Sequence, residues 1–164
     1  MRIQPNPIQQ EHINLADSLH DLVPIAEEIL GLQEDKSLVI VCGSISTGGR
    51  SVEENLVVFE KSIAAMPHYG YLVFDQMPWE KKIEFFHHLF YKTNDPNVYH
   101  WDILEVFYKP IFSSKKIKTA FFLPGWKRST GASWEHEKCK ELGIEIIYLP
   151  KKWVLDFDPE KLFK

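Results

Sequence analysis

The segment from Gly125 to Glu137, GWKRSTGASWEHE, combines small, hydroxyl-bearing and acidic residues in an order that suits anion binding and catalysis. It follows the apolar run Thr119–Leu123 and leads into a segment with helical character. Backbone N–H groups and the helix dipole favour an anion at such a helix start. Glu135 lies about one helical turn, roughly 5–6 Å, further along the axis. This displacement is similar to the separation between the 5'-phosphate of a nucleotide and its anomeric carbon.

Each of these residues has a structural interpretation as well as a functional one. Glu135 either presents its carboxylate to C1' of a nucleotide or, with Glu137, complements the helix dipole. Ser129 either caps the helix or binds an oxyanion, and Gly131 leaves room for a ligand. Hydrolysis at an anomeric centre commonly uses two carboxylates. Asp102, near another predicted helix start, is either the second carboxylate or an ordinary first-turn aspartate.

A glycine-rich loop, Gly43–Arg50, follows the continuous apolar run Ser37–Cys42. Its glycines let the backbone approach a phosphate or a sugar closely, and Arg50 can supply a fixed cation. The loop lacks the Gly-x-Gly-x-x-Gly spacing of dinucleotide sites and the Lys-Ser/Thr of a P-loop. A plain strand-to-helix connection with a surface arginine therefore remains an equal alternative.

The elements that position these loops alternate between strands and helices, which predicts a parallel sheet covered on both faces. We expect a Rossmann/flavodoxin-like three-layer α/β fold with a mostly parallel sheet of about four to five strands. In that strand order the first and third strands are neighbours, so the Gly43–Arg50 loop and the Ser129–Glu135 turn would face one pocket. The predicted strands are 37–42, 71–74, 119–123 and 144–149, and the predicted helices are 51–66, 79–91, 99–112 and 131–142.

Three parts of the chain are expected: an N-terminal extension (1–35), the main domain (36–150) and a C-terminal tail (151–164). Residues 1–14 are predicted to be irregular. Residues 15–32 have helical spacing, with Pro24 dividing the stretch or lying in the first turn of its second part. In the helix after Ser51, the predicted buried face consists of Val52, Leu56, Phe59, Ile63 and Met66.

Composition limits the possible partners. The 164 residues fit one domain, and 45% hydrophobic with 26% charged residues is typical of a globular protein. A net charge of −4 argues against a nucleic-acid partner, and no apolar run reaches membrane-spanning length. The two cysteines, Cys42 and Cys139, are expected to be buried free thiols, which favours a cytoplasmic location.

Histidines and tryptophans are expected to have structural roles. His87 and His88 are adjacent and point to different faces of their helix, and His136 and Cys139 have no further ligand close in sequence. No metal is therefore expected. Trp126 and Trp134 can stack on a base, although aromatic packing is the commoner role.

Three motifs together resemble the nucleoside 2-deoxyribosyltransferase superfamily. They are Val41-Cys-Gly-Ser-Ile-Ser-Thr-Gly-Gly-Arg50, Asp95-Pro…Tyr99-x-x-Asp102 and Ser129-x-Gly-x-x-x-Glu135. Similar motifs occur in its 2'-deoxynucleoside 5'-monophosphate N-glycosidases, and the segment around Glu135 is similar to that of small uncharacterised bacterial and phage members. The resemblance covers roughly residues 38–149, with the motifs in the same order.

The resemblance implies a mechanism and a set of site residues. Glu135 would be the nucleophile that forms a glycosyl–enzyme intermediate, and Asp102 would assist departure of the base and activate the acceptor. No organic cofactor or metal is implied, and family members are usually dimers or larger oligomers. The implied substrate-binding residues are Gly43, Ser44, Ile45, Gly49, Arg50, Gln76, Tyr99, Ser129 and Gly131, with Gln76 near the base.

We therefore expect an N-glycosidase, hydrolase or transferase, that acts on a nucleoside 5'-monophosphate. A non-catalytic nucleotide-binding or sensing domain is the alternative from another class. A phosphoribohydrolase of the cytokinin-activating type is the weaker enzyme alternative, because Pro124-Gly-Trp126 departs from the Pro-Gly-Gly-x-Gly-Thr signature of that type.

Overall fold

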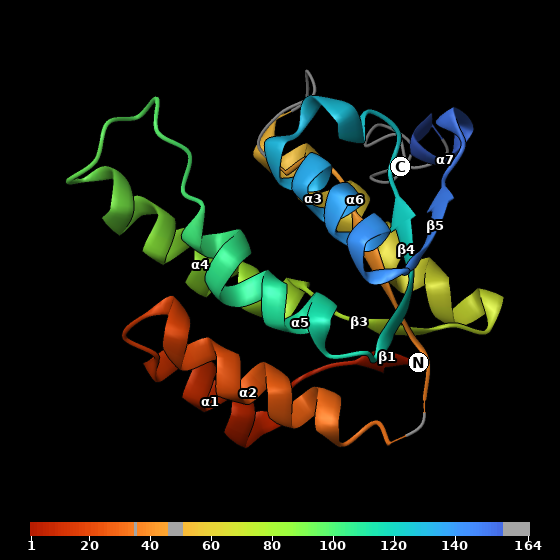
Figure 1. Cartoon of the computed structure of the whole chain (residues 1–164), viewed down its shortest axis with the longest axis horizontal. Coiled ribbons are helices and arrows are strands. Elements are labelled where there is room, and N and C mark those ends of the chain that lie inside the picture. Colours follow the sequence, from red (N-terminus) through yellow and green to blue (C-terminus); the bar gives the residue numbers. More distant parts are fainter. Residues whose placement is uncertain (35, 46–50, 156–164) are drawn as a thin grey trace, which may run out of the picture. The chain divides into compact units, whose positions relative to one another are not determined.

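The computed structural model describes residues 1–34, 36–45 and 51–155 (Figure 1). The chain divides into two compact units. The first contains Met1–Arg2, Ser37–Phe74 and the chain from Ile117 onward, and the second contains Ile3–Lys36 and Asp75–Lys116. The strands gather in the first unit, whereas the second is helical.

The sheet has five strands in the order β1-β3-β2-β4-β5. β2 pairs in parallel with β3 and with β4, and β4 pairs in parallel with β5. The predicted flavodoxin-like arrangement, with the first and third predicted strands adjacent, is therefore confirmed. The strands are β1 (Arg2–Ile3), β2 (Leu38–Cys42), β3 (Leu72–Phe74), β4 (Ile117–Phe122) and β5 (Glu145–Tyr148).

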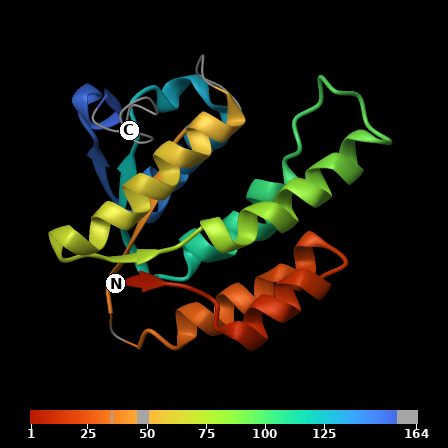
Figure 2. The same ribbon diagram turned by 180° about the vertical axis from the view of Figure 1, so that it is seen from behind.

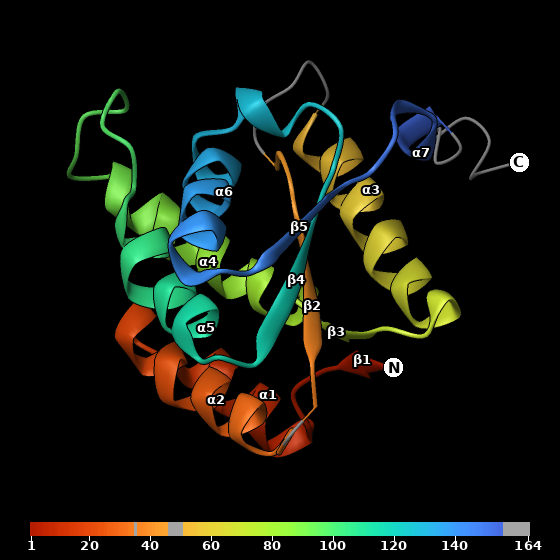
Figure 3. The ribbon, with the colours of Figure 1, turned by 45° about the vertical axis from the view of Figure 1, so that its right-hand side comes forward.

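Helices cover both faces of the sheet in the first unit, which gives the three layers expected from the sequence. α3 (Val52–Ala65) lies on one face and α6 (Thr130–Leu142) on the other (Figure 3). Seen from behind, α3 (gold) lies in front of α6 (blue), with the strands between them (Figure 2). All five residues of β2 are buried, as a strand covered on both faces requires.

The buried face of α3 matches the predicted one at Phe59, Ile63 and Met66 but differs at Val52 and Leu56. Val52 is exposed and Leu56 is only partly buried. The buried stripe instead includes the polar residues Asn55 and Ser62, so an apolar pattern alone could not find it. Ser62 satisfies its hydroxyl by donating to the Val58 carbonyl (2.7 Å) and accepting from Trp153 Nε1 (2.9 Å). The stripe consists of Asn55, Val58, Phe59, Ser62 and Ile63, and it continues into the following turn, η1 (Met66–Tyr69), through Met66.

Local sequence accounts for both ends of α6. The Ser129 hydroxyl accepts a hydrogen bond from the Ala132 N–H (3.2 Å), so Ser129 is the N-cap. Gly143 ends the helix in the left-handed region, with φ 68°, a conformation that glycine adopts without steric cost. The predicted helix over 131–142 is confirmed.

The second unit begins with two helices where the sequence analysis expected an irregular segment and a Pro24 break, and both expectations are wrong. α1 (Pro7–Leu15) starts with a capping box, because Asn6 and Gln9 exchange hydrogen bonds between side chain and backbone at 2.9 Å. α2 (Leu19–Gly31) contains Pro24 in its interior. The break between helices lies earlier, because α1 ends at Leu15 and α2 begins at Leu19. At the start of α2 the Asp21 carboxylate accepts a hydrogen bond from the Ser18 N–H (3.1 Å).

The remaining helices of this unit follow the predicted positions, with one difference. α4 (Met77–Tyr91) is confirmed. The predicted helix over 99–112 starts later and is a π-helix, η2 (Ile103–Tyr108), followed by α5 (Lys109–Ser113). Pro110 has no N–H for an ordinary helical bond, and Lys109 donates five residues back to the Leu104 carbonyl. Trp79 and Phe107, with ring centroids 5.1 Å apart, lie in the core of this unit.

Two short elements complete the described chain. η3 (Trp126–Arg128) connects β4 to α6, and α7 (Lys151–Leu155) follows β5. Among the described residues, none of the helices combines the length and the apolar character needed to cross a bilayer.

Gly43 directly follows β2 and packs against Leu123, which directly follows β4. A Cβ built at Gly43 would lie 2.9 Å from Leu123 Cβ and 2.8 Å from Leu123 Cδ1. The Leu123 N–H also donates to the Cys42 carbonyl (2.8 Å). The absence of a side chain at this position therefore lets β2 and β4 stay paired up to their carboxyl ends.

We predict that Gly43→Ala destabilises the protein by about 1–3 kcal/mol, because the new methyl group overpacks the contact with Leu123. Urea denaturation followed by circular dichroism measures the change. Gly31→Ala is the matched control, because a Cβ there meets nothing within 4 Å and Gly31 ends α2. A Gly43→Ala protein as stable as the control would contradict this account of the strand ends.

Candidate active site around Glu135

Glu135 lies on the buried stripe of α6 and retains only 6% exposure. The stripe consists of Ala132, Glu135, His136 and Cys139, at the spacing expected for the side of a helix that packs on a sheet. A carboxylate in such a position loses its hydration and needs compensating polar contacts. A glutamate that only complements the helix dipole can stay exposed to solvent, so the burial of Glu135 is not explained by that role alone.

The side chains of Cys42 and Glu135 form a hydrogen bond at the carboxyl end of β2. Burial raises the pKa of Cys42 well above its ordinary value. The negative charge of Glu135, the electrostatic interaction with Cys139 and the hydrogen bond to Glu135 each raise this pKa further. Burial and then the Glu135 charge also raise the pKa of Cys139 to about 12. Both thiols are therefore protonated near neutral pH and are poor nucleophiles.

The described part of the glycine-rich loop is fixed by α3. Asn55, which is 7% exposed, donates its side-chain N–H to the Ile45 carbonyl at 2.8 Å. Gly43 is buried, and Ser44 and Ile45 are partly buried, so these three follow β2 closely. Gly49 and Arg50, the proposed phosphate contacts of this loop, lie outside the described residues. Whether the two loops face one pocket therefore stays a prediction.

The start of α6 has the properties of an anion site. Ala132 donates to the Ser129 hydroxyl and Ser133 donates to the Ser129 carbonyl (2.9 Å), which accounts for two of the first backbone N–H groups. Thr130 and Gly131 are the first two residues of α6, so their N–H groups have no acceptor within the helix itself. The Ser129 hydroxyl acts as an acceptor in the cap, and its own proton can still be donated to an oxyanion.

The other predicted site residues belong to the second unit. Asp102 is exposed and immediately precedes η2, and π-helical segments frequently accompany functional sites. Tyr99 is partly buried, with its ring 4.8 Å from that of Trp101. Gln76 is 5% exposed, and within the described residues its Oε1 atom has no hydrogen-bond partner. A buried amide oxygen without a partner is uncommon and suits a residue that meets a ligand.

Glu80, on α4, is a carboxyl group that the sequence analysis missed. Burial raises its pKa to about 7, a hydrogen bond with Tyr108 lowers it, and the nearby Glu84 raises it. A carboxyl group that titrates near neutral pH has the acid–base properties that catalysis uses. Its sequence context, an aromatic-rich helix, gives no signal for this, because the burial arises from residues distant in the chain.

A stack of aromatic rings forms next to the Glu135 segment. Trp126 and His136 are 4.1 Å apart with an interplanar angle of 18°, and His136 Nε2 shares a 2.7 Å hydrogen bond with the Tyr148 hydroxyl. Trp126 therefore packs on protein side chains, which is the commoner role of tryptophan. Among the described residues no group of three or more His, Cys, Asp or Glu side chains is arranged to hold a metal ion.

Comparison with known proteins adds nothing to these observations: no family model, curated protein or solved structure matches this chain. The resemblance to the nucleoside 2-deoxyribosyltransferase superfamily consequently depends on the three motifs alone.

The raised pKa of Glu80 makes stability depend on pH. The folded protein holds this proton more tightly than the unfolded chain, so stability falls as pH rises from about 4.5 to about 7. We predict that Glu80→Gln, which cannot ionise, is more stable than the wild type at pH 8 by on the order of 1–2 kcal/mol. At pH 4.5 the two proteins should have similar stability.

Denaturant melts at the two pH values measure this difference, with the exposed α2 residue Glu27→Gln as control. An equal gain for both variants at pH 8, or a gain for Glu80→Gln that persists at pH 4.5, would show that Glu80 does not carry the effect.

Proposed function

We propose that this protein cleaves the N-glycosidic bond of a nucleoside 5'-monophosphate, with Glu135 as the nucleophile. The observation that carries the proposal is the burial of the Glu135 carboxylate against Cys42, at the carboxyl end of a central parallel strand. Ligands of open α/β sheets bind at this edge, where the strand order reverses between β2 and β4. A nucleophile held there can reach the anomeric carbon of a bound nucleotide.

The helix start supports a phosphorylated substrate. The N–H groups of Thr130 and Gly131, together with the positive end of the α6 dipole, attract an anion. Glu135 follows about one turn later, roughly 5–6 Å along the axis. If the helix start binds the phosphate and the Glu135 carboxylate faces C1', the nucleotide can bind in one orientation only.

The reaction has two displacement steps. In the first, a Glu135 oxygen attacks C1' as the C1'–N bond breaks, and the base leaves with the bonding electrons and takes a proton from the Asp102 carboxyl group. In the second, Asp102 removes a proton from water, the water oxygen attacks C1', and the bond to Glu135 breaks. The products are the free base and the sugar 5-phosphate, and both carboxyl groups return to their starting state.

The neutral thiols around Glu135 have a chemical consequence in this scheme. Cys42, a neutral group, hydrogen-bonds to Glu135. In this proposal the charge of Glu135 stabilises the positive charge that develops on the sugar in the transition state. The electrostatic stabilisation is larger where water is excluded, as at this buried position.

The proposal predicts that base release depends on Glu135. The protein is incubated with ribo- and deoxyribonucleosides and their 5'-monophosphates, and free base is followed by chromatography. We expect release from at least one 5'-monophosphate and a loss of at least about a thousandfold in Glu135→Gln, because the nucleophile is removed. Glu137→Gln, an exposed glutamate on the same helix, is the matched control and should stay within about twofold.

Release that is undiminished in Glu135→Gln would remove Glu135 from this role. Nucleotide binding without base release from any substrate would instead favour the non-catalytic nucleotide-binding alternative.

A further inference from the structure

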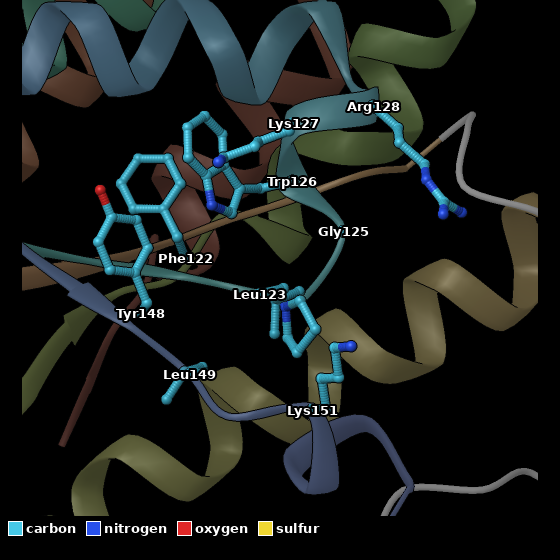
Figure 4. A pocket seen from close by; sticks show the side chains of 10 residues that line it. Phe122, Leu123, Gly125, Trp126, Lys127, Arg128, Tyr148, Leu149 and Lys151 are labelled. Carbon is cyan, nitrogen blue, oxygen red and sulfur yellow. The ribbon is translucent and has the colours of Figure 1, made fainter.

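An open pocket of about 560 Å³ lies at the carboxyl ends of β4 and β5 in the first unit (Figure 4). The end of β4, the connection through η3, and the end of β5 with the start of α7 form its walls. None of the residues described above as contacts of Glu135 lines it. Its main side chains are Phe122, Trp126, Tyr148, Lys127, Arg128 and Lys151.

The polar side chains of this pocket are cationic. Lys127 and Arg128 extend from η3, and Lys151 comes from the first position of α7 (Figure 4). In the described part of the chain, no acidic side chain lines the pocket. Because the whole protein has a net charge of −4, three cations around one cavity are a local feature. They suit a ligand with a doubly charged anionic group such as a phosphate monoester.

The opposite part of the pocket is a rigid aromatic surface. The Trp126 and Tyr148 rings are nearly parallel, with an interplanar angle of 14° and centroids 6.0 Å apart. The hydrogen bond to His136 Nε2 fixes the Tyr148 hydroxyl, and stacking on His136 fixes Trp126. Tyr148 nevertheless remains 57% exposed. A tyrosine that is held in place yet keeps an open face can stack on a planar ligand with little loss of side-chain entropy.

We propose that this pocket binds a free nucleoside monophosphate, with the base against Tyr148 and the phosphate attracted by the positive charge of Lys127, whose Nζ lies 5.8 Å from the Trp126 ring centroid, and of Arg128 and Lys151 on the pocket wall. Its volume falls in the range of small-molecule sites, roughly 300–1,000 Å³, and fits one nucleotide better than a strand. Stacking of a base on an aromatic side chain is favourable for every base, which suits a ligand with a planar ring as well as a phosphate. The net negative charge of the protein opposes a polyanionic strand.

This site does not depend on the proposed activity of Glu135. Trp126 lines the pocket, whereas Trp134 immediately precedes Glu135 on α6, so the two tryptophans report on different places. Trp79 is fully buried in the other unit and serves as an internal reference. Binding in the pocket and binding at Glu135 are therefore separable in one experiment.

The test is fluorine NMR of the full chain labelled with fluorotryptophan, with resonances assigned by single Trp→Phe variants. Titration with AMP is expected to shift the Trp126 resonance to saturation and to leave Trp79 unchanged. Adenosine, which lacks the phosphate, and ribose 5-phosphate, which lacks the base, should each require at least about tenfold higher concentrations. Glu135→Gln should leave the Trp126 titration unchanged, whatever its effect on base release.

Variants test the two parts of the pocket. Lys127→Ala with Lys151→Ala should weaken the AMP titration of Trp126 at least about tenfold, since two cations are removed. Lys118→Ala is the matched control, because Lys118 is exposed at the other end of β4 and lies outside the pocket. Tyr148→Leu should weaken the titration, whereas Tyr148→Phe, which keeps the ring, should weaken it less.

Four results would overturn the proposal. The first is a Trp126 resonance that does not move up to millimolar AMP. The second is an unchanged midpoint in the double lysine variant with its fold intact by circular dichroism. The third is a single-stranded oligonucleotide that shifts Trp126 at lower concentration than AMP, which would assign the pocket to a nucleic-acid strand. Movement of Trp134 alone would place nucleotide binding at the Glu135 site only and would also reject this pocket.

Discussion

Burial of a carboxylate at the end of a central strand is the constraint on which the rest of this structure depends. An ionised carboxylate inside a protein is costly unless polar groups compensate for the lost hydration. Here the fold keeps Glu135 at 6% exposure and gives it a hydrogen bond with Cys42. The pairing of β2 with β4, which Gly43 permits by leaving room for Leu123, holds the strand end against α6. A carboxylate that the fold keeps buried in this way is a candidate for function.

Short-range patterns predicted most of the first unit. The apolar run at Ser37–Cys42 had to be a strand covered on both faces, and β2 is buried throughout. Ser129 and Gly143 are typical residues for the two ends of a helix and occupy those positions in α6. Parallel order followed from the alternation of strands and helices. These predictions succeeded because each depends on residues close together in the chain.

One local signal was missed: α1 starts with a capping box of Asn6 and Gln9, which a search for apolar periodicity does not detect. The other missed features depend on residues distant in sequence. Glu80 titrates near pH 7 because other parts of its unit bury it, and the pocket at Tyr148 forms only when β4 and β5 lie side by side. Asp102 and Glu135 fall in different units, so spacing along the chain says nothing about their separation. The role of Asp102 therefore remains a proposal of chemistry rather than of geometry.

The two ligand sites proposed here share one segment of chain and use different physics. Around Glu135, a buried carboxylate and a helix start suit a reaction at a sugar carbon next to a phosphate. In the pocket of Trp126 and Tyr148, cations and an exposed ring suit reversible recognition of a nucleotide. The β4–α6 connection carries both, since Leu123 packs on Gly43 while Trp126 faces the pocket.

Direct detection of the covalent intermediate tests the central claim most sharply. A nucleoside 5'-monophosphate with fluorine at C2' destabilises the positively charged transition state and slows both displacement steps. With a leaving base reactive enough to sustain the first step, the protein should gain the mass of the fluorinated sugar phosphate. Peptide mapping by mass spectrometry should then locate this mass on Glu135. Base release without an adduct, or an adduct on any other residue, would contradict the account of Glu135 as the nucleophile.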